Sequence, residues 1–224
     1  DEDITFQGIA ILKYLIPKYT EMYQAKLSDE LEISKLINDM YNYKGHPSTV
    51  GALKLMLHIP LRVTNIVNLK WSSINFENKF LTIQRKEMKS RDKKVSDFKI
   101  PLSDEVIDIL NTMNHYNGHT DYVFYSNNKK QHINEDTPNI ALQRMGYKNM
   151  QTAHGLRGVY RSLAETYSYK HNISDIVMEK FLDHKENNKT KAPYSSDAKY
   201  FNHFIPLVKW WSDFIIDLKN RDTK

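Results

Sequence analysis

Residues 80–102 read FLTIQRKEMKSRDKKVSDFKIPL and contain two alternating segments on either side of a basic loop. Apolar and polar side chains alternate in residues 80–85, and they alternate again in residues 98–102. A period of two is that of a β-strand, because successive side chains of a strand point to opposite faces. The stretch therefore predicts an antiparallel hairpin whose connection, residues 86–94, is rich in lysine.

Helical spacing of apolar residues precedes this hairpin. Ser28 is predicted to cap one helix, and Thr64 to cap another that runs to about Lys70. Between them a helix is expected over residues 49–57, ended by Pro60, because proline interrupts helical hydrogen bonding. The first of these helices should bury an apolar stripe formed by Ile33, Leu36, Ile37 and Met40.

Helical spacing returns after the hairpin. Ser103 is predicted to cap a helix, Ser174 to cap residues 175–182, and Pro206 to open a final helix. The apolar stripe after Ser103 consists of Val106, Ile109, Leu110 and Met113. The stripe of the final helix, expected to belong to the core, consists of Leu207, Trp210, Trp211, Phe214, Ile215 and Leu218. The predicted fold class is α+β, mostly α with a small antiparallel β-sheet.

The composition excludes several classes of protein. The chain has 224 residues, a formal net charge of +5 and no cysteine. Disulfide scaffolds, thiolate zinc sites and cysteine nucleophiles are therefore excluded. No secretory signal is visible, and no apolar stretch approaches the roughly 20 residues that cross a bilayer, so a cytoplasmic protein without a membrane partner is expected. The missing initiator methionine indicates a fragment of a longer protein, or trimming of its start.

The segment His154-Gly155-Leu156-Arg157 places a histidine and an arginine three residues apart, on one face of a helix. One side chain could hold a phosphate while the other moves a proton. Taken alone, such a pair is more often structural, and Arg62 alone would be interpreted as a surface ion-pair residue. More specific is the order of several features along the chain: Arg62, the lysine-rich hairpin, His154 with Arg157, Leu182-Asp183-His184, and Tyr194.

This ordered series resembles the catalytic domain of the tyrosine recombinases, the phage integrase family, and looks closest to integrases of satellite phages and genomic islands. The resemblance covers about residues 27–214. It implies the tyrosine recombinase catalytic-domain fold for residues 27–224, with residues 1–26 as the end of a core-binding domain and its linker. It also implies a site-specific DNA recombinase that cleaves and rejoins strands through a 3′-phosphotyrosyl intermediate.

The resemblance also assigns roles to individual residues. Tyr194 would be the nucleophile, while Arg62 and Arg157 would bind the non-bridging oxygens of the phosphate. His154 and His184 would handle protons and help to position the phosphate.

A hairpin lysine would protonate the departing 5′-oxygen. The number of residues that separate it from Ile83 in the sequence favours Lys89, whereas counting back from Pro101 favours Lys93. Lys89 is preferred. The resemblance implies neither a metal nor ATP, because cations of the chain balance the phosphate and the phosphotyrosine keeps the bond energy. The implied partner is double-stranded DNA, on which a homotetramer would join two duplexes. As an alternative to core packing of the final helix, the resemblance implies that the segment after Tyr194 can pack on a neighbouring protomer.

The chain departs from the family pattern at three positions. Asn65 stands where an acidic residue is usual, Asp183 replaces the usual glycine before the second histidine, and Pro193 precedes Tyr194. None of these changes removes a group that the chemistry needs.

Several alternatives stay open at the level of the sequence. Tyr200 also follows His184, although it lies in an aromatic run that favours packing. A type IB topoisomerase or a hairpin telomere resolvase would share the chemistry. A decayed integrase that binds DNA without cutting it is the alternative from another class, but retention of all five of Arg62, His154, Arg157, His184 and Tyr194 argues against decay.

Overall fold

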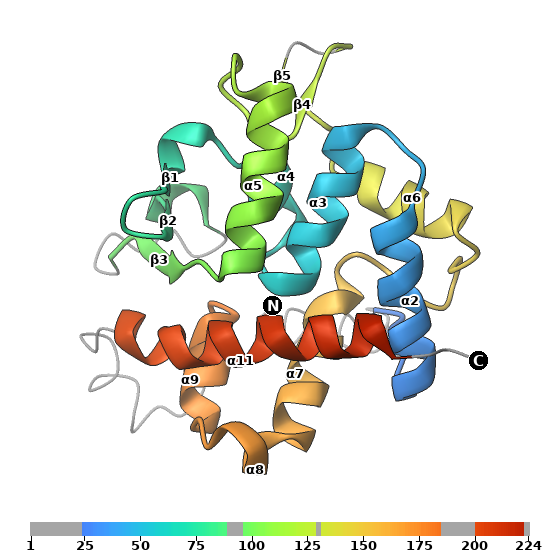
Figure 1. Cartoon of the computed structure of the whole chain (residues 1–224), viewed down its shortest axis with the longest axis vertical. Helices are drawn as coiled ribbons and strands as arrows, with labels where there is room; N and C mark the ends of the chain where they lie inside the picture. The colour runs from blue at the N-terminus through green and yellow to red at the C-terminus, as the bar shows by residue number, and fades with distance from the viewer. Residues whose placement is uncertain (1–23, 89–95, 129–130, 185–199, 222–224) are drawn as a thin grey trace, which may run out of the picture.

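A computed structural model of the chain describes residues 24–88, 96–128, 131–184 and 200–221 (Figure 1). In chain order its helices and 3-10 turns are α2 Glu30–Asn42, α3 Pro47–His58, α4 Val63–Val67, η1 Trp71–Ser73, η2 Arg85–Glu87, α5 Asp104–Asn117, α6 Thr137–Arg144, α7 Gly155–Thr166, α8 Ser168–His171, α9 Asp175–Phe181 and α11 Phe201–Asn220. The strands are β1 Ile74–Asn75, β2 Phe80–Ile83, β3 Phe98–Pro101, β4 Tyr125–Ser126 and β5 Gln131–His132. The predicted class, mostly helical with small antiparallel sheets, is confirmed.

The predicted hairpin is the centre of the larger sheet. Strand β2 pairs with β1 on one side and with β3 on the other, both antiparallel, and Leu81 faces Ile100 across the β2–β3 pair. Strand β2 is shorter than predicted, because the chain turns after Ile83 into η2, which begins at Arg85. Arg85 therefore lies at the base of the hairpin rather than within a strand.

The helices before the hairpin follow the predicted order with shifted ends. The stripe on α2 is buried as predicted, but the cap is Asp29 and not Ser28, because the Asp29 carboxylate accepts hydrogen bonds from two backbone N–H groups of the first turn. Helix α3 begins at Pro47, a residue that suits a first helical position, and ends before Pro60.

The predicted cap of α4 was wrong. The helix begins at Val63 with Arg62 at the N-cap, so Thr64 lies inside the first turn, where its hydroxyl donates a hydrogen bond to Glu135. The helix also ends earlier than expected, at Val67. This short helix presents Arg62 at its start, next to the segment that contains Asp183.

Helix α5 begins as predicted, with Ser103 accepting a hydrogen bond from the backbone N–H of Val106, and it buries the expected stripe. Helix α9 likewise begins after Ser174, although the serine side chain makes no capping hydrogen bond.

The predicted start of the final helix was wrong. Helix α11 begins at Phe201, and Pro206 lies inside it with its ring exposed to solvent. A proline here removes one N–H donor from the helix, and the extra turn brings in Phe204, which is buried against Phe98 and Phe181. Packing of that aromatic side chain favours the additional turn despite the lost hydrogen bond.

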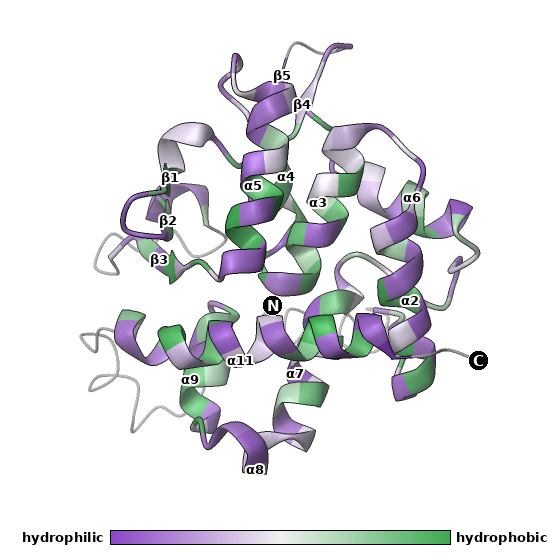
Figure 2. Cartoon of the chain, viewed as in Figure 1, coloured by the Kyte–Doolittle hydropathy of each residue, from purple (hydrophilic) through white to green (hydrophobic). Residues whose placement is uncertain are grey.

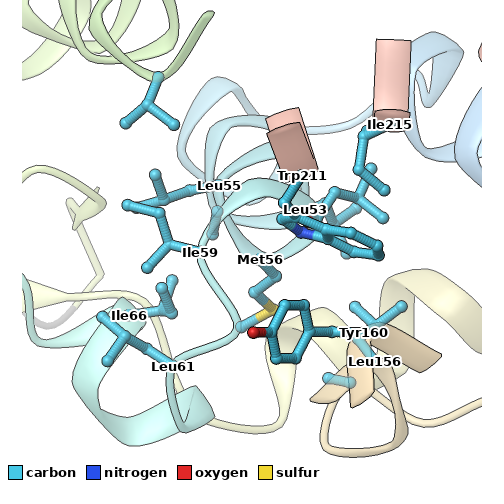
Figure 3. Close-up of a cluster of buried hydrophobic side chains, with 14 of the residues drawn as sticks. Leu53, Leu55, Met56, Ile59, Leu61, Ile66, Leu156, Tyr160, Trp211 and Ile215 are labelled. Carbon is cyan, nitrogen blue, oxygen red and sulfur yellow. The ribbon is translucent and has the colours of Figure 1, made fainter. Parts of the chain in front are cut away.

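Helix α11 packs on its own chain. It runs beneath α3 and β3 (Figure 1). Its expected stripe is part of the core, with Trp211 only 2% exposed, except that Trp210 is partly buried and packs against the core. In Figure 3, Trp211 and Ile215 meet side chains of α3 and Tyr160 of α7. Hydrophobic residues gather where the helices face one another, whereas α8 and the β4–β5 end are hydrophilic (Figure 2). The final helix therefore closes the core on which the flanking helices are held.

A buried histidine in this core predicts acid sensitivity. The ring of His58 bonds to Ser212 and Tyr41 at 2.8 and 2.6 Å, and burial, followed by the charge of Lys219, lowers its pKa to about 3. The unfolded chain takes up this proton below about pH 6.5, so the stabilisation is complete above that pH and is lost as the pH falls toward 3. Between these two pH values, we expect His58 to lower the free energy of unfolding by roughly 1 kcal/mol for each unit by which the pH falls.

Urea unfolding at pH 7.5 and 5.5 measures this contribution. The His58→Gln variant should lose less unfolding free energy between the two pH values than the parent chain does. Equal losses in the two proteins would contradict the assignment.

Candidate active site

Arg62, at the N-cap of α4, and Arg157, in α7, both bond to the segment that follows α9. Arg157 lies in the first turn of α7, and its side chain is buried, with 6% of the residue exposed. Its terminal nitrogens donate to the carbonyl oxygens of Pro60 and Leu182, at 2.6 and 2.7 Å. The guanidinium thus ties the segment before Arg62 to the segment after α9.

Arg62 and Arg157 bond to the adjacent residues Asp183 and Leu182, so their positive charges affect each other. Burial, and then the positive charge of Arg62, lower the pKa of Arg157 from its usual value to about 10, while Asp183 and Glu179 act in the opposite direction. Arg157 remains charged at neutral pH. An anion placed between the two guanidinium groups would relieve their repulsion, so the pair is suited to bind a phosphate.

His184 lies between Arg157 and an acidic residue. Its Nε2 is 3.2 Å from a terminal nitrogen of Arg157, and its Nδ1 is 2.7 Å from the carboxylate of Glu179. The geometry fits a ring that donates from Nδ1 to Glu179 and accepts at Nε2. Burial opposes ionisation of Glu179, but hydrogen bonds from Arg161 and His184 outweigh it and lower the pKa of Glu179. Glu179 therefore stays a carboxylate that orients the His184 ring.

His154 is the N-cap residue of α7 and has helical backbone angles, with φ −68° and ψ −37°. Its side chain is exposed, whereas Arg157 is buried. The two residues therefore belong to one segment but to different environments.

Asp183 connects the site to the hairpin. One carboxylate oxygen is 3.0 Å from Arg62, and the other is 2.7 Å from Arg85. Its backbone has φ of +54°, in the left-handed region that favours glycine and that aspartate tolerates better than most residues. Asn65, by contrast, is buried and donates to the carbonyl oxygen of Glu87 at 3.2 Å.

Three of the residues expected in the site lie outside the described residues: Lys89, its alternative Lys93, and Tyr194. Tyr200, the alternative nucleophile, is partly buried, lies at the start of α11 and stacks on Phe204 with ring centroids 6.3 Å apart. These contacts support the interpretation of Tyr200 as a packing residue.

Sequence reasoning missed two residues that hold the site together, Arg85 and Glu179. Arg85 looked like the last residue of a strand, next to the basic loop, and Glu179 like one more polar residue of a helix. Only the spacing of Glu179, five residues before His184, offered a signal. In the part of the chain that the structure describes, no group of histidine and acidic residues could hold a metal ion. None of the described helices is both long and apolar enough to cross a membrane.

The sequence profile of the phage integrase family matches residues 27–199. The integrase of Shigella phage Sf6 is 25% identical over 175 residues, covering 77% of this chain and 43% of the phage protein. The integrase of Enterobacteria phage P4 is 27% identical over 191 residues, covering 80% and 43% of the two chains. This chain thus spans less than half the length of either relative.

Solved structures are similar in fold. A λ integrase dimer bound to a COC′ core site matches with a TM-score of 0.53 and 18% identity, covering 80% of this chain and 49% of the other. The XerA recombinase matches with a TM-score of 0.52 and 17% identity, covering 89% and 66%. The described part of the chain has the fold of a tyrosine recombinase catalytic domain, and the chain belongs to the phage integrase family.

Proposed function

We propose that this chain is the catalytic part of a site-specific DNA recombinase that cleaves and rejoins strands through a 3′-phosphotyrosyl intermediate. The observation that carries the proposal is the convergence of Arg62, Arg157 and His184 at residues 182–184, where Arg157 bonds to the Leu182 carbonyl and to His184, and Arg62 bonds to Asp183. A cluster of guanidinium groups with an oriented imidazole suits a phosphodiester whose negative charge increases as it is attacked.

In this mechanism the Tyr194 hydroxyl attacks phosphorus, and the bond from phosphorus to the 5′-oxygen breaks. A phenol has a pKa near ~10, so its proton must leave during attack, and the site histidines accept it. Arg62 and Arg157 bind the non-bridging oxygens. Lys89 gives its proton to the departing 5′-oxygen, with Lys93 as the alternative. A second 5′-hydroxyl reverses the step and joins a new strand, with no metal ion or ATP.

The proposed partner is double-stranded DNA. Among the structural neighbours is a λ integrase tetramer bound to a Holliday junction, and we extend this assembly to the present chain as a homotetramer on two duplexes. Residues 1–26 are proposed to end a core-binding domain. Because the whole of that domain would complete the clamp around DNA, residues 1–224 alone should bind DNA weakly and with a strong dependence on salt.

A covalent-adduct assay tests the enzyme against a non-catalytic DNA-binding remnant. Nicked duplexes are tiled across the ends of the mobile element that encodes the chain, so that cleavage releases a short strand and traps the protein. The recombinase should form an adduct that survives denaturation, with or without a metal chelator. A shift of the DNA in native gels without any adduct would favour the remnant.

Replacement of Glu179 tests the role assigned to His184. The Glu179→Gln variant removes the charge that orients the imidazole, and we expect adduct formation at saturating DNA to slow by about tenfold or more. The matched control is Glu165→Gln, because Glu165 pairs with the same Arg161 but not with His184. Equal rates for the two variants would remove Glu179 from the site.

A further inference from the structure

A single carboxylate, that of Asp183, is shared by two arginines. Its oxygens are divided between them, one 3.0 Å from Arg62 and the other 2.7 Å from Arg85. A second terminal nitrogen of Arg62 reaches the backbone oxygen of Asp183 at 3.5 Å. Both ends of the carboxylate are thus occupied, and its side chain is only 10% exposed.

Arg85 is held in place by hydrogen bonds to the hairpin. Its Nε donates to the carbonyl oxygen of Ser96 at 3.1 Å, and its backbone N–H donates to Asp97 at 2.8 Å. These partners lie across the hairpin from Arg85. The Arg85 side chain is 11% exposed, whereas the Arg62 side chain is 22% exposed, so Arg62 is the more accessible of the two to a DNA phosphate.

The backbone conformation does not explain why position 183 is an aspartate. A φ of +54° favours glycine, so an aspartate here is retained at some conformational cost. The carboxylate pairs with both Arg62 and Arg85, and it acts on the pKa of Arg157 in the direction that keeps that residue charged. Asn65 cannot supply this charge, since it is neutral and bonded to the Glu87 carbonyl.

We infer that Arg85 is a positioning residue, which acts through Asp183 to hold Arg62 in the orientation that receives the scissile phosphate. The inference rests on the proposed function. It also links two parts of the site, because the same Arg85 fixes the base of the hairpin that contains the candidate lysines. Arg62 offers its remaining N–H groups to the phosphate, while Arg85 stays on the far side of the carboxylate.

The test compares single and double variants in the adduct assay with the full-length protein at saturating DNA. Arg85→Gln should slow the rate constant of adduct formation by about tenfold or more, with the DNA affinity and the final amount of adduct unchanged. Asp183→Asn, which keeps a residue that tolerates the left-handed backbone, should slow it at least as much. The double variant should be no slower than Asp183→Asn, because Arg85 acts only through that carboxylate.

Lys86→Gln is the matched control, since Lys86 is an exposed cation in the same turn as Arg85. It should weaken DNA binding at most, and leave the rate constant at saturation within about twofold. Arg85→Lys, which restores the charge, should recover part of the lost rate.

Four outcomes would overturn the inference. A lower final amount of adduct at a normal rate constant would indicate that Arg85 only supports folding. Additive effects in the double variant would show that Arg85 does not act through Asp183. A faster reaction of either single variant would mean that the carboxylate competes with the phosphate. Absence of any wild-type adduct would instead overturn the proposed function, and this inference with it.

Discussion

Replacing Tyr194 with phenylalanine is expected to abolish the covalent adduct, with a loss of more than about 10³-fold in its rate of formation. Phenylalanine lacks only the hydroxyl that would attack phosphorus, so binding of DNA should be retained. The measurement is denaturing electrophoresis of the protein after incubation with a nicked duplex, alongside a native gel for binding.

Tyr200→Phe is the matched control for this experiment. Tyr200 follows Tyr194 closely in the sequence, but its ring packs on Phe204 at the start of α11. We expect this variant to form the adduct at nearly the parental rate. An adduct that persists in Tyr194→Phe and disappears in Tyr200→Phe would exchange the two assignments.

The second large effect is expected for Arg157→Lys. The guanidinium reaches two carbonyl oxygens and the imidazole of His184 at once, which a single ammonium group cannot do. The lysine variant keeps the charge but loses the planar guanidinium group with its several N–H donors (the planar fork). The rate of adduct formation should therefore fall by about 10²-fold or more. Some of the carbonyl groups would be left without a donor, with a loss of stability of about 1–3 kcal/mol.

Two measurements separate these contributions. Urea unfolding gives the stability, and adduct formation under conditions where both proteins are folded gives the chemistry. Arg144→Lys is the control, because Arg144 is an exposed arginine at the end of α6. It should change neither the stability nor the rate of adduct formation. A folded Arg157→Lys protein with parental activity would contradict the role of the fork.

Local signals in the sequence predicted much of the fold. Ser103 followed by acidic residues and an apolar stripe specified α5, and alternation on both sides of the basic loop specified the β2–β3 pair. These features depend on neighbouring residues alone, so sequence patterns were sufficient. The family expectation was also confirmed, although it depended on the order of several short motifs rather than on any one of them.

The predicted helix starts were wrong where contacts with residues distant in the sequence determine the start of the helix. Pro206 is a good start for a helix, yet α11 begins earlier because Phe204 finds an aromatic pocket between Phe98 and Phe181. Thr64 is a good cap, yet its hydroxyl bonds to Glu135, far away in the sequence. Neither partner could be identified from local spacing.

In the candidate site, too, some residues could be predicted from the sequence and others depend on tertiary contacts. Arg62, Arg157 and His184 were predicted from the series, because their types and order are specific, and they lie together in the structure, while their catalytic roles stay predictions. Arg85 was not, because only the fold brings it to Asp183, 98 residues later. The departure at Asp183 was visible in the sequence, but its pairing with two arginines required the structure.

The most direct test of the central claim is to identify the residue that carries the DNA. The adduct of the wild-type protein is digested with nuclease and protease, and the peptide that retains a nucleotide is sequenced by mass spectrometry. The proposed mechanism predicts a nucleotide linked through its 3′-phosphate to Tyr194. A nucleotide on any other residue, or DNA bound firmly without a covalent link, would contradict it.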